Sequence, residues 1–306
     1  MIKAITKSAL LIALFAVNSN AFLGLGRGVL IADKGSASIT IKATGGTVTD
    51  DGLYRVHTFT SNGTFTVIPT SLSVDMLLVA GGGGGGEGHG GGGGGGGLIY
   101  RTSTPISANA YSVVIGTGGA AKTTGSNANG NPGGNTTFST FTAIGGGLGA
   151  GYGGTGGNGG SGGGSGGEGG GGGTATSGQG YGGGSMNGTA NGTGGGGGGC
   201  GSAGSSGDGT YNTTDRGGSG GLPCTYSISG TLKSYSAGGG AGAYTTIGLS
   251  QDDCAGDGGD GKNHVPASAG QANTGCAGGG GSAGGTGSDR YGAAGGSGIV
   301  IFRYLR

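Results

Sequence analysis

The sequence predicts a mainly β protein in which a small N-terminal β-sheet, closed by the C-terminal strand, flanks a Gly-rich sandwich made of a polyglycine II helix bundle. Glycine supplies 95 of the 306 residues and is concentrated after residue 80. Polar and apolar residues alternate in segments before residue 116, and residues 299–304 (IVIFRY) are rich in the β-branched and aromatic residues typical of a strand. Between Gly145 and Ser297 there are only eight large aliphatic side chains, too few for an apolar core. Main-chain interactions must therefore order that region.

Residues 1–21 are typical of a signal peptide. Lys3 and Lys7 precede an apolar run at residues 8–17, and residues 19–21 (SNA) have the small-x-small pattern of a cleavage site. The apolar run is too short to cross a bilayer. We therefore expect export and no membrane span after cleavage. The alternative is an N-terminal helix that stays attached to the protein.

The remaining chain divides into an N-terminal extension with one β-strand, residues 22–51, and a glycine-rich domain, residues 52–306. In that domain strands are expected within residues 54–115 and at residues 299–304. The runs 54–59 and 64–68 alternate on either side of Asn62-Gly63, which predicts a hairpin. Further strands are expected at residues 74–80, 98–100 and 111–115. The last strand should pair back onto this sheet, making the Gly-rich region a long insertion.

The Gly-rich region has a period of three. The non-Gly residues fall at Tyr152, Thr155, Asn158 and Ser161, and after one slip at Ser165 and Glu168. A polyglycine II helix has three residues per turn and no internal hydrogen bonds, so neighbouring helices must satisfy its backbone groups. We expect inner helices at residues 81–86 and 90–97, an outer helix at residues 152–161, and a turn at Glu87 and His89.

Four cysteines lie in the Gly-rich region, at Cys200, Cys224, Cys254 and Cys276. Their spacing contains no CxxC pair, which argues against zinc. In an exported chain they predict two disulfides, and three connectivities remain open. We accordingly place the protein outside the cell.

Charge and motif content exclude several functions. Lys plus Arg number 14 and Asp plus Glu 13, so there is no basic footprint for nucleic acid. No catalytic constellation stands out, and we expect neither an enzyme nor a cofactor. Asp257 and Asp260, with Asp252 and Asp253 nearby, are weak candidates for a Ca²⁺ site. The alternative for these carboxylates is a solvated loop beside Cys254.

Candidate binding residues are concentrated where the Gly density falls, between Asn187 and His264. Tyr among Ser, Gly and Asn is the composition of adaptable binding loops. The alternative is that these segments are ordinary turns between helices. The receptor-binding candidates are Tyr181, Met186, Tyr211, Arg216, Leu222, Tyr226, Tyr235 and Tyr244.

Four segments also resemble a known family. Residues 54–66 (YRVHTFTSNGTFT), 77–86 (LLVAGGGGGG), 111–119 (YSVVIGTGG) and 295–304 (GGSGIVIFRY) are similar to the glycine-rich domain of phage tail and tail-fibre proteins. The tip adhesins of T-even-like phage fibres are similar polyglycine II stacks, whose turns present loops to a host receptor. The resemblance implies a non-catalytic recognition module.

Together these observations predict an adhesin, secreted or carried on a virion fibre, that binds a host-cell receptor or glycan. Its partners would also include a fibre or filament protein, or another copy of the chain. One alternative is a structural subunit of an extracellular filament or matrix, assembled by strand addition through residues 29–41. A second is an ice-binding protein that uses the row Thr155, Asn158 and Ser161.

Overall fold

The computed structural model describes residues 41–306 apart from residues 125, 188–191, 211–212 and 283–286. The signal-like segment and most of the N-terminal extension, including residues 38–40 of its expected strand, lie outside the described residues. Ile41 and Lys42 precede the first strand. None of the helices in the described part of the chain is long and apolar enough to cross a bilayer.

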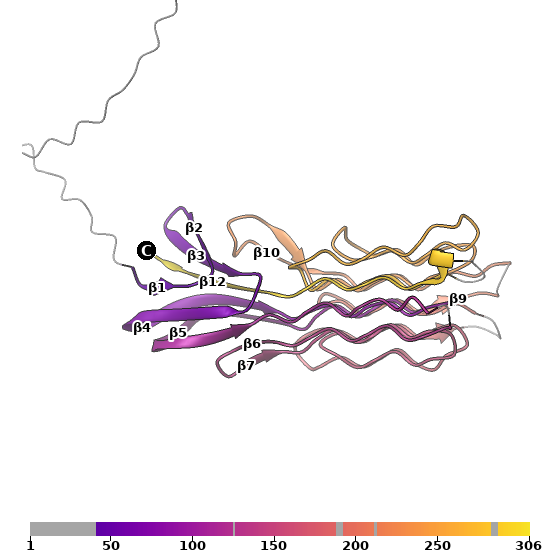
Figure 1. The fold of residues 1–306 in the computed structure, drawn as a ribbon, viewed down its shortest axis with the longest axis horizontal. Coiled ribbons are helices and arrows are strands. Elements are labelled where there is room, and N and C mark those ends of the chain that lie inside the picture. The colour runs from indigo at the N-terminus through magenta and orange to yellow at the C-terminus, as the bar shows by residue number, and fades with distance from the viewer. Residues whose placement is uncertain (1–40, 125, 188–191, 211–212, 283–286) are drawn as a thin grey trace, which may run out of the picture. The chain divides into compact units, whose positions relative to one another are not determined.

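The described residues form strands and almost no helix (Figure 1). The mainly β prediction is therefore confirmed. The strands are β1 (Ala43–Thr44), β2 (Thr47–Asp51), β3 (Tyr54–Phe59), β4 (Gly63–Val79), β5 (Leu98–Val114), β6 (Thr136–Phe138), β7 (Phe141–Ala143), β8 (Met186–Asn187), β9 (Gly207–Asp208), β10 (Cys224–Tyr226), β11 (Lys233–Tyr235) and β12 (Ile299–Leu305), and the one short 3-10 helix described is η1 (Gly287–Arg290).

The main sheet is antiparallel and joins the two ends of the described chain. Its strand order is β2-β3-β12-β4-β5-β6-β7, with β1 also paired to β4. Ile301 of β12 lies opposite Thr58 of β3 on one side and Leu77 of β4 on the other. The expected return of the C-terminal strand to the N-terminal sheet is confirmed. Because β1 and β2 belong to this sheet, its first strands precede residue 52.

The predicted hairpin between residues 54–59 and 64–68 is wrong, because β12 separates β3 from β4. The amide oxygen of Asn62 instead accepts a hydrogen bond from the backbone N–H of Ile115, at 2.8 Å. Gly63, next in the chain, pairs with Val113 of β5. A local turn signal was overridden by long-range pairing, because β12 pairs with both β3 and β4 and so takes the edge of β4 that the hairpin would have used.

The strands expected at residues 74–80, 98–100 and 111–115 are parts of longer elements. Residues 64–68 and 74–79 are continuous within β4, and the other two runs are the ends of β5. The pairing shifts register at two places along the β4–β5 pair, which lets the polar middle of each strand stay in the ladder.

Both faces of the central strands are buried. Met76 and Leu78 face one cluster, where Phe65 and Phe302 stack with ring centroids 4.2 Å apart. Leu77 and the other alternate residues face a second cluster, to which the β10–β11 hairpin contributes. Because successive side chains of a strand point to opposite faces, each central strand contributes residues to both apolar clusters.

The Gly-rich segments run side by side from the sheet to a group of turns (Figure 1). Their hydrogen-bond partners repeat every three residues. Gly83 and Gly86 donate to residues 94 and 91, Gly84 and Glu87 to residues 131 and 128, and Gly85 and Gly88 to residues 293 and 290. Successive backbone N–H groups thus point toward three different neighbours.

These segments approach too closely to accommodate side chains. Residues 81–86 and 90–97 are all buried, as expected of inner segments. A Cβ on Gly85 would lie 2.0 Å from the carbonyl oxygen of Gly279, and one on Gly93 would lie 2.2 Å from that of Gly83. Only Gly fits at such positions.

The expected outer row of side chains is only partly correct. Thr155 and Asn158 are exposed and Tyr152 is half-buried, but Ser161 and Ser165 are buried. The chain bends at residues 160–161, just before the slip in the three-residue period, and then enters the interior. There the N–H of Ser161 donates to Gly95.

Candidate functional site

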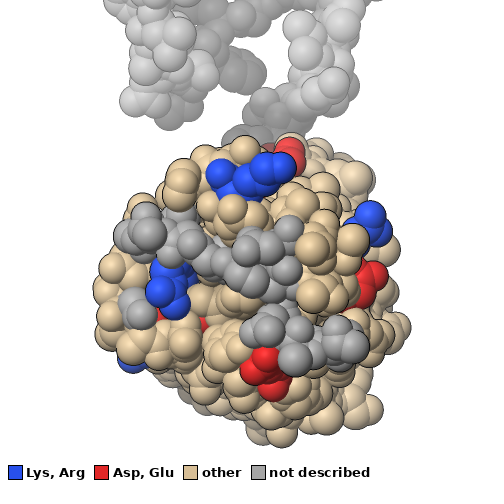
Figure 2. Space-filling view, turned by 90° about the vertical axis from the view of Figure 1, so that its right-hand side faces the viewer, with Lys and Arg blue, Asp and Glu red and all other residues tan. Residues whose placement is uncertain are grey.

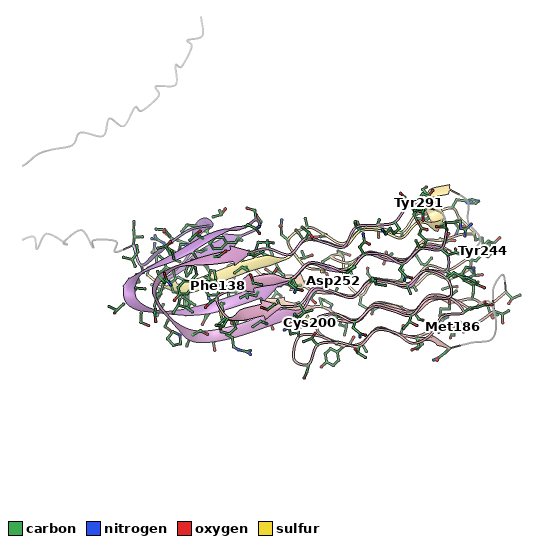
Figure 3. All side chains as sticks on the ribbon, turned by 60° about the horizontal axis from the view of Figure 1, so that its bottom comes forward. Phe138, Met186, Cys200, Tyr244, Asp252 and Tyr291 are labelled. Carbon is green, nitrogen blue, oxygen red and sulfur yellow. A yellow bond between two sulfur atoms is a disulfide. The ribbon has the colours of Figure 1, made fainter. Side chains whose placement is uncertain are left out.

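Turns from distant parts of the chain meet at the end of the Gly-rich segments farthest from the sheet (Figure 3). We call this group the loop end; its described residues are 87–89, 124, 126–128, 152–154, 166–170, 208–210, 213–216, 243–247 and 287–291. Backbone hydrogen bonds link them directly. The N–H of Gly88 donates to Arg290 at 3.0 Å, that of Tyr152 to Glu87 at 3.2 Å, and that of Gly167 to His89 at 2.9 Å.

Glu87 holds two of these turns together. Its side chain is 1% exposed, and its carboxylate accepts hydrogen bonds from the backbone N–H groups of Thr124, Ser126 and Ala128 at 2.7 to 3.1 Å. The Thr124 hydroxyl donates a fourth at 3.0 Å. The turn expected at Glu87 and His89 is confirmed, with Gly88 and His89 at positive φ.

His89 and Tyr152 form an aromatic pair at the loop end. Their ring centroids lie 5.2 Å apart. Burial lowers the pKa of His89, so the imidazole is held in its neutral form. A side-chain hydrogen bond with Glu168 raises the pKa of the Tyr152 hydroxyl. The rings of His89 and Tyr152 are therefore held in place by contact with each other and by the hydrogen bond of Tyr152 with Glu168.

A second buried carboxylate ties two further turns. Asp215 accepts hydrogen bonds from the N–H groups of Tyr244 and Thr245, at 2.7 and 3.3 Å, and from the Thr245 hydroxyl. The next residue, Arg216, bridges Asp208 on one side and Thr246 on the other through its backbone, while its side chain is exposed. The guanidinium is thus presented from a fixed backbone.

The structure divides the predicted receptor-binding residues between two places. Met186, Arg216 and Tyr244 lie at the loop end, where the Met186 sulfur accepts a hydrogen bond from the N–H of Glu168 at 2.9 Å. Tyr211 lies outside the described residues. Tyr181 and Tyr226 line a groove beside the sheet.

Two other candidates have different surroundings. Leu222 is 47% exposed and precedes the hairpin strand β10. Tyr235 is wrong as a binding residue, because it is 1% exposed and packs with Ile228 and Ile301 in the second apolar cluster. Its position in β11 faces the sheet, and a large apolar ring gains most from that burial.

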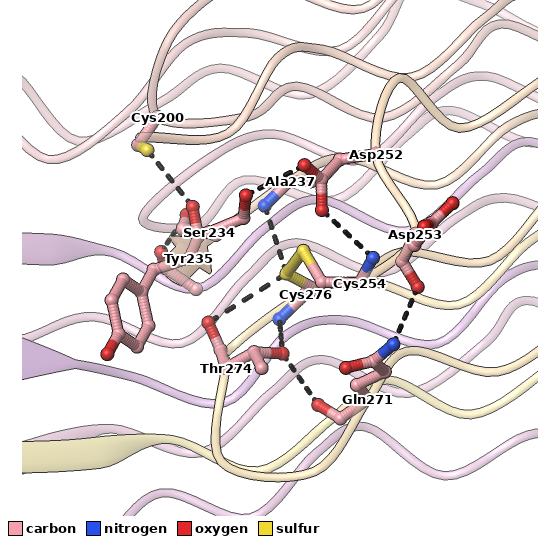
Figure 4. The surroundings of a disulfide bond; sticks show 12 residues. Cys200, Ser234, Tyr235, Ala237, Asp252, Asp253, Cys254, Gln271, Thr274 and Cys276 are labelled. Carbon is pink, nitrogen blue, oxygen red and sulfur yellow. Dashed lines mark hydrogen bonds between the residues drawn. A yellow bond between two sulfur atoms is a disulfide. The ribbon is translucent and has the colours of Figure 1, made fainter. Parts of the chain in front are cut away.

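The four cysteines form two disulfides, Cys200–Cys224 and Cys254–Cys276. The second is buried, and its Cys276 sulfur accepts a hydrogen bond from the N–H of Ala237 at 3.4 Å (Figure 4). The first lies at the junction of the Gly-rich segments and the sheet. Two disulfides are typical of a protein in an oxidising, extracellular environment.

The acidic residues suggested for calcium accept hydrogen bonds from other groups of the protein. Asp257 accepts hydrogen bonds from the N–H and hydroxyl of Ser250, and Asp260 from the N–H groups of residues 262 and 263. Asp252 accepts one from the Ser234 hydroxyl (Figure 4). In the described ranges no group of three or more His, Cys, Asp or Glu residues could hold a metal ion.

The loop end is mixed in charge. Isolated basic and acidic side chains lie among uncharged residues on this face, and neither sign dominates (Figure 2). Such a surface suits hydrogen bonding and aromatic contact more than attraction to a polyanion.

The anchoring residues of the loop end were not among the predicted binding residues. Glu87 was expected to form a turn with His89, and Asp215 lies within residues 187–264, where most of the predicted binding residues are found, but neither was expected to anchor neighbouring turns. One signal could have indicated that role: a carboxylate needs hydrogen-bond donors when the chain around it is buried. Which turns supply those donors depends on the tertiary structure.

Comparison with known proteins gives one family. A family model described as a glycine-rich domain matches residues 60–305. No curated protein matches the chain. The matched region includes the main part of the sheet, the Gly-rich segments and the described loop end, so this chain belongs to the glycine-rich domain family.

Proposed function

We propose that this chain is a non-catalytic recognition protein that acts outside the cell and binds a receptor or a glycan through its loop end. One observation carries the proposal. Turns separated by up to about 200 residues of sequence, from residue 87 to residue 291, are hydrogen-bonded to one another at one end of the protein. Binding residues are disproportionately found on loops that a rigid scaffold positions.

We further propose that the Gly-rich segments are polyglycine II helices. The threefold repeat of hydrogen-bond partners supports this assignment, because that helix has three residues per turn. The close approach of backbones at Gly85 and Gly93 is also what a bundle of such helices requires. A bundle of this kind would hold the loops rigidly, so that little conformational entropy is lost when they bind.

The resemblance to phage tail-fibre proteins supports display on a virion fibre, and the two disulfides support a secreted protein. The filament alternative depends on residues 29–41, of which only Ile41 is described. The ice-binding alternative is weakened, because the side chain of Ser161 is buried and cannot belong to an exposed row with Thr155 and Asn158.

Binding of the purified full-length chain to intact bacterial cells and to a glycan array tests the proposal. We expect saturable binding by the monomer. The variants Arg216→Ala and Tyr244→Ala should each weaken it by about tenfold, as truncation of an Arg or Tyr anchor commonly does. Leu232→Ala is the matched control, because Leu232 is 72% exposed in the turn between β10 and β11.

Three results would contradict the proposal. Binding that both loop-end variants leave unchanged would remove the loop end as the binding surface. Concentration-dependent polymerisation without cell or glycan binding would favour the filament. Thermal hysteresis in the freezing of its solutions would favour ice binding.

A further inference from the structure

We infer that a groove beside the Cys200–Cys224 disulfide is a second binding site, and that it takes a neutral sugar ring. The groove lies where the Gly-rich segments meet the sheet, at the opposite end of those segments from the loop end (Figure 3). It does not depend on the loop-end proposal, and its residues can be varied separately.

Two strands supply the apolar side of the groove. In β5, Leu98 and Tyr100 are two residues apart and so point to the same face, as do Cys224 and Tyr226 in β10. The rings of Tyr100 and Tyr226 are 4.6 Å apart, tilted by 38°. Both rings are only partly buried, although they pack against the second apolar cluster. Aromatic surface is therefore held in place and left accessible.

The opposite side is a turn fixed by the side chain of Gln179. Its amide group donates to the carbonyl oxygen of Thr142 at 3.0 Å and accepts from the N–H of Ile144 at 2.8 Å. Its own carbonyl oxygen accepts from the N–H of Leu98 at 3.1 Å. The turn is thus tied both to β5 and to the segment after β7, so the groove is preformed.

The groove has room for a small ligand. It consists of two adjoining cavities of about 440 and 370 Å³, which share Leu98, Gln179 and Tyr226. Volumes of this size are typical of small-molecule sites. At the rim, Tyr181 is 51% exposed, and a Cβ on Gly178 would meet no atom within 4 Å. A ligand can therefore enter without displacing side chains.

The chemistry of the lining favours a sugar. A pyranose has an apolar C–H face that packs on aromatic rings and a perimeter of hydroxyls that need polar partners. The groove offers tyrosine rings, whose hydroxyls can donate or accept, together with Ser177 and the exposed backbone at Gly178. Arg101 is the only charged residue among the described lining, and its guanidinium donates to the carbonyl oxygen of Tyr100 at 3.0 Å. Because Arg101 is exposed and water screens its charge, the uncharged tyrosine and backbone groups dominate the lining, and they suit a neutral ligand.

Saturation-transfer NMR on the full-length chain tests the inference. The probes are the methyl glycosides of glucose, galactose, mannose and N-acetylglucosamine, each at millimolar concentration. We expect transfer to the C–H protons of at least one glycoside. Tyr181→Ala and Tyr226→Ala should weaken its binding by about tenfold, whereas Tyr226→Phe, which keeps the ring, should weaken it less.

Tyr54→Ala is the matched control, because it removes an exposed tyrosine of β3 that lies neither in the groove nor at the loop end. Circular dichroism of Tyr226→Ala checks its fold, and Tyr181→Ala removes a side chain that is already half exposed. The inference is wrong if none of the four glycosides shows transfer. It is also wrong if the groove variants bind as well as the parent, or if a tyrosine-rich peptide occupies the groove in preference to every sugar. Loss of cell binding in loop-end variants alone would bear on the other proposal and leave this one standing.

Discussion

A Cβ placed on Gly85 would lie 2.0 Å from the carbonyl oxygen of Gly279, although 194 residues of sequence separate the two. The N–H of Gly85 meanwhile donates to Ala293 at 2.9 Å. A methyl group at residue 85 would therefore force apart segments whose hydrogen bonds hold them together. The Gly-rich region is sensitive to the smallest side chain at its centre.

Gly85→Ala should lower the free energy of unfolding by about 3 kcal/mol or more, because backbone atoms cannot move away as a flexible side chain can. Chemical denaturation followed by circular dichroism measures the change. Gly171→Ala is the matched control, since a Cβ there would meet only the Ser185 hydroxyl at 3.8 Å. Equal stability of the two variants would contradict the close packing.

Amide exchange should separate buried glycines from exposed ones. The N–H groups of Gly93 and Gly94 donate to Gly278 and Gly147 at 2.9 and 2.8 Å in the interior of the Gly-rich region. We expect them to exchange roughly a thousandfold more slowly than those of the exposed Gly170 and Gly171, because opening them requires cooperative unfolding. NMR of the labelled protein, with its disulfides intact, gives the rates. Uniformly fast exchange would show that the main chain does not order this region.

Glu87→Gln should loosen the loop end without unfolding the sheet. The amide keeps one acceptor oxygen but turns an NH₂ group toward backbone donors, at a cost of about 1–3 kcal/mol. Chemical-shift changes and faster amide exchange should be confined to Thr124, Ala128 and neighbouring turns. Glu168→Gln, on an exposed side chain of the same end, is the control. The expectation fails if Thr124 and Ala128 keep their protection.

Stability should fall in mild acid. Burial lowers the pKa of both His57 and His89, so the folded protein binds fewer protons than the unfolded chain. The free energy of unfolding should therefore be highest above the ordinary histidine pKa of about 6.5 and decrease as the pH falls below it.

His57 lies between two fixed partners, which makes it the residue to vary. Its Nδ1 lies 2.7 Å from the carbonyl oxygen of Gly45, and its Nε2 lies 3.1 Å from the Tyr304 hydroxyl, which donates to it in the neutral form. His57→Gln should give a shallower fall between pH 7 and 5, whatever its stability at neutral pH. An unchanged slope in denaturation series at several pH values would exclude His57 as a contributor.

The two disulfides should differ in their response to reductant. Cys254 and Cys276 are buried, whereas Cys200 and Cys224 are half-buried at the rim of the groove. Mild reduction under native conditions should open Cys200–Cys224 first, and alkylation followed by peptide mass analysis identifies the bond. Each bridge closes a loop of similar length, so removing either should lower stability by about 2–4 kcal/mol. Simultaneous reduction of both bonds would contradict the ranking by burial.

Sequence reasoning was most successful where the signal is local. The β-branched and aromatic residues at 299–304 predicted β12, and the polar residues Glu87 and His89 predicted a turn between two glycine runs; both are confirmed. It was weaker for contacts made at long range. The Asn62-Gly63 signal suggested a hairpin, yet β12 lies between the two strands.

By itself, the sequence determined that this protein is mainly β, that its Gly-rich half has too few large aliphatic side chains to be ordered by an apolar core alone, and that strands precede and follow that half. These properties follow from composition and short periods, which each segment carries alone. Tertiary structure decided the strand order, the pairing of Cys200 with Cys224, the burial of Tyr235 and the meeting of distant turns at the loop end. The physical reason is that every glycine segment offers the same backbone N–H and C=O groups, so one segment can pair with many others. Which of them pair is decided by the few side chains, the disulfides and the sheet that anchor their ends.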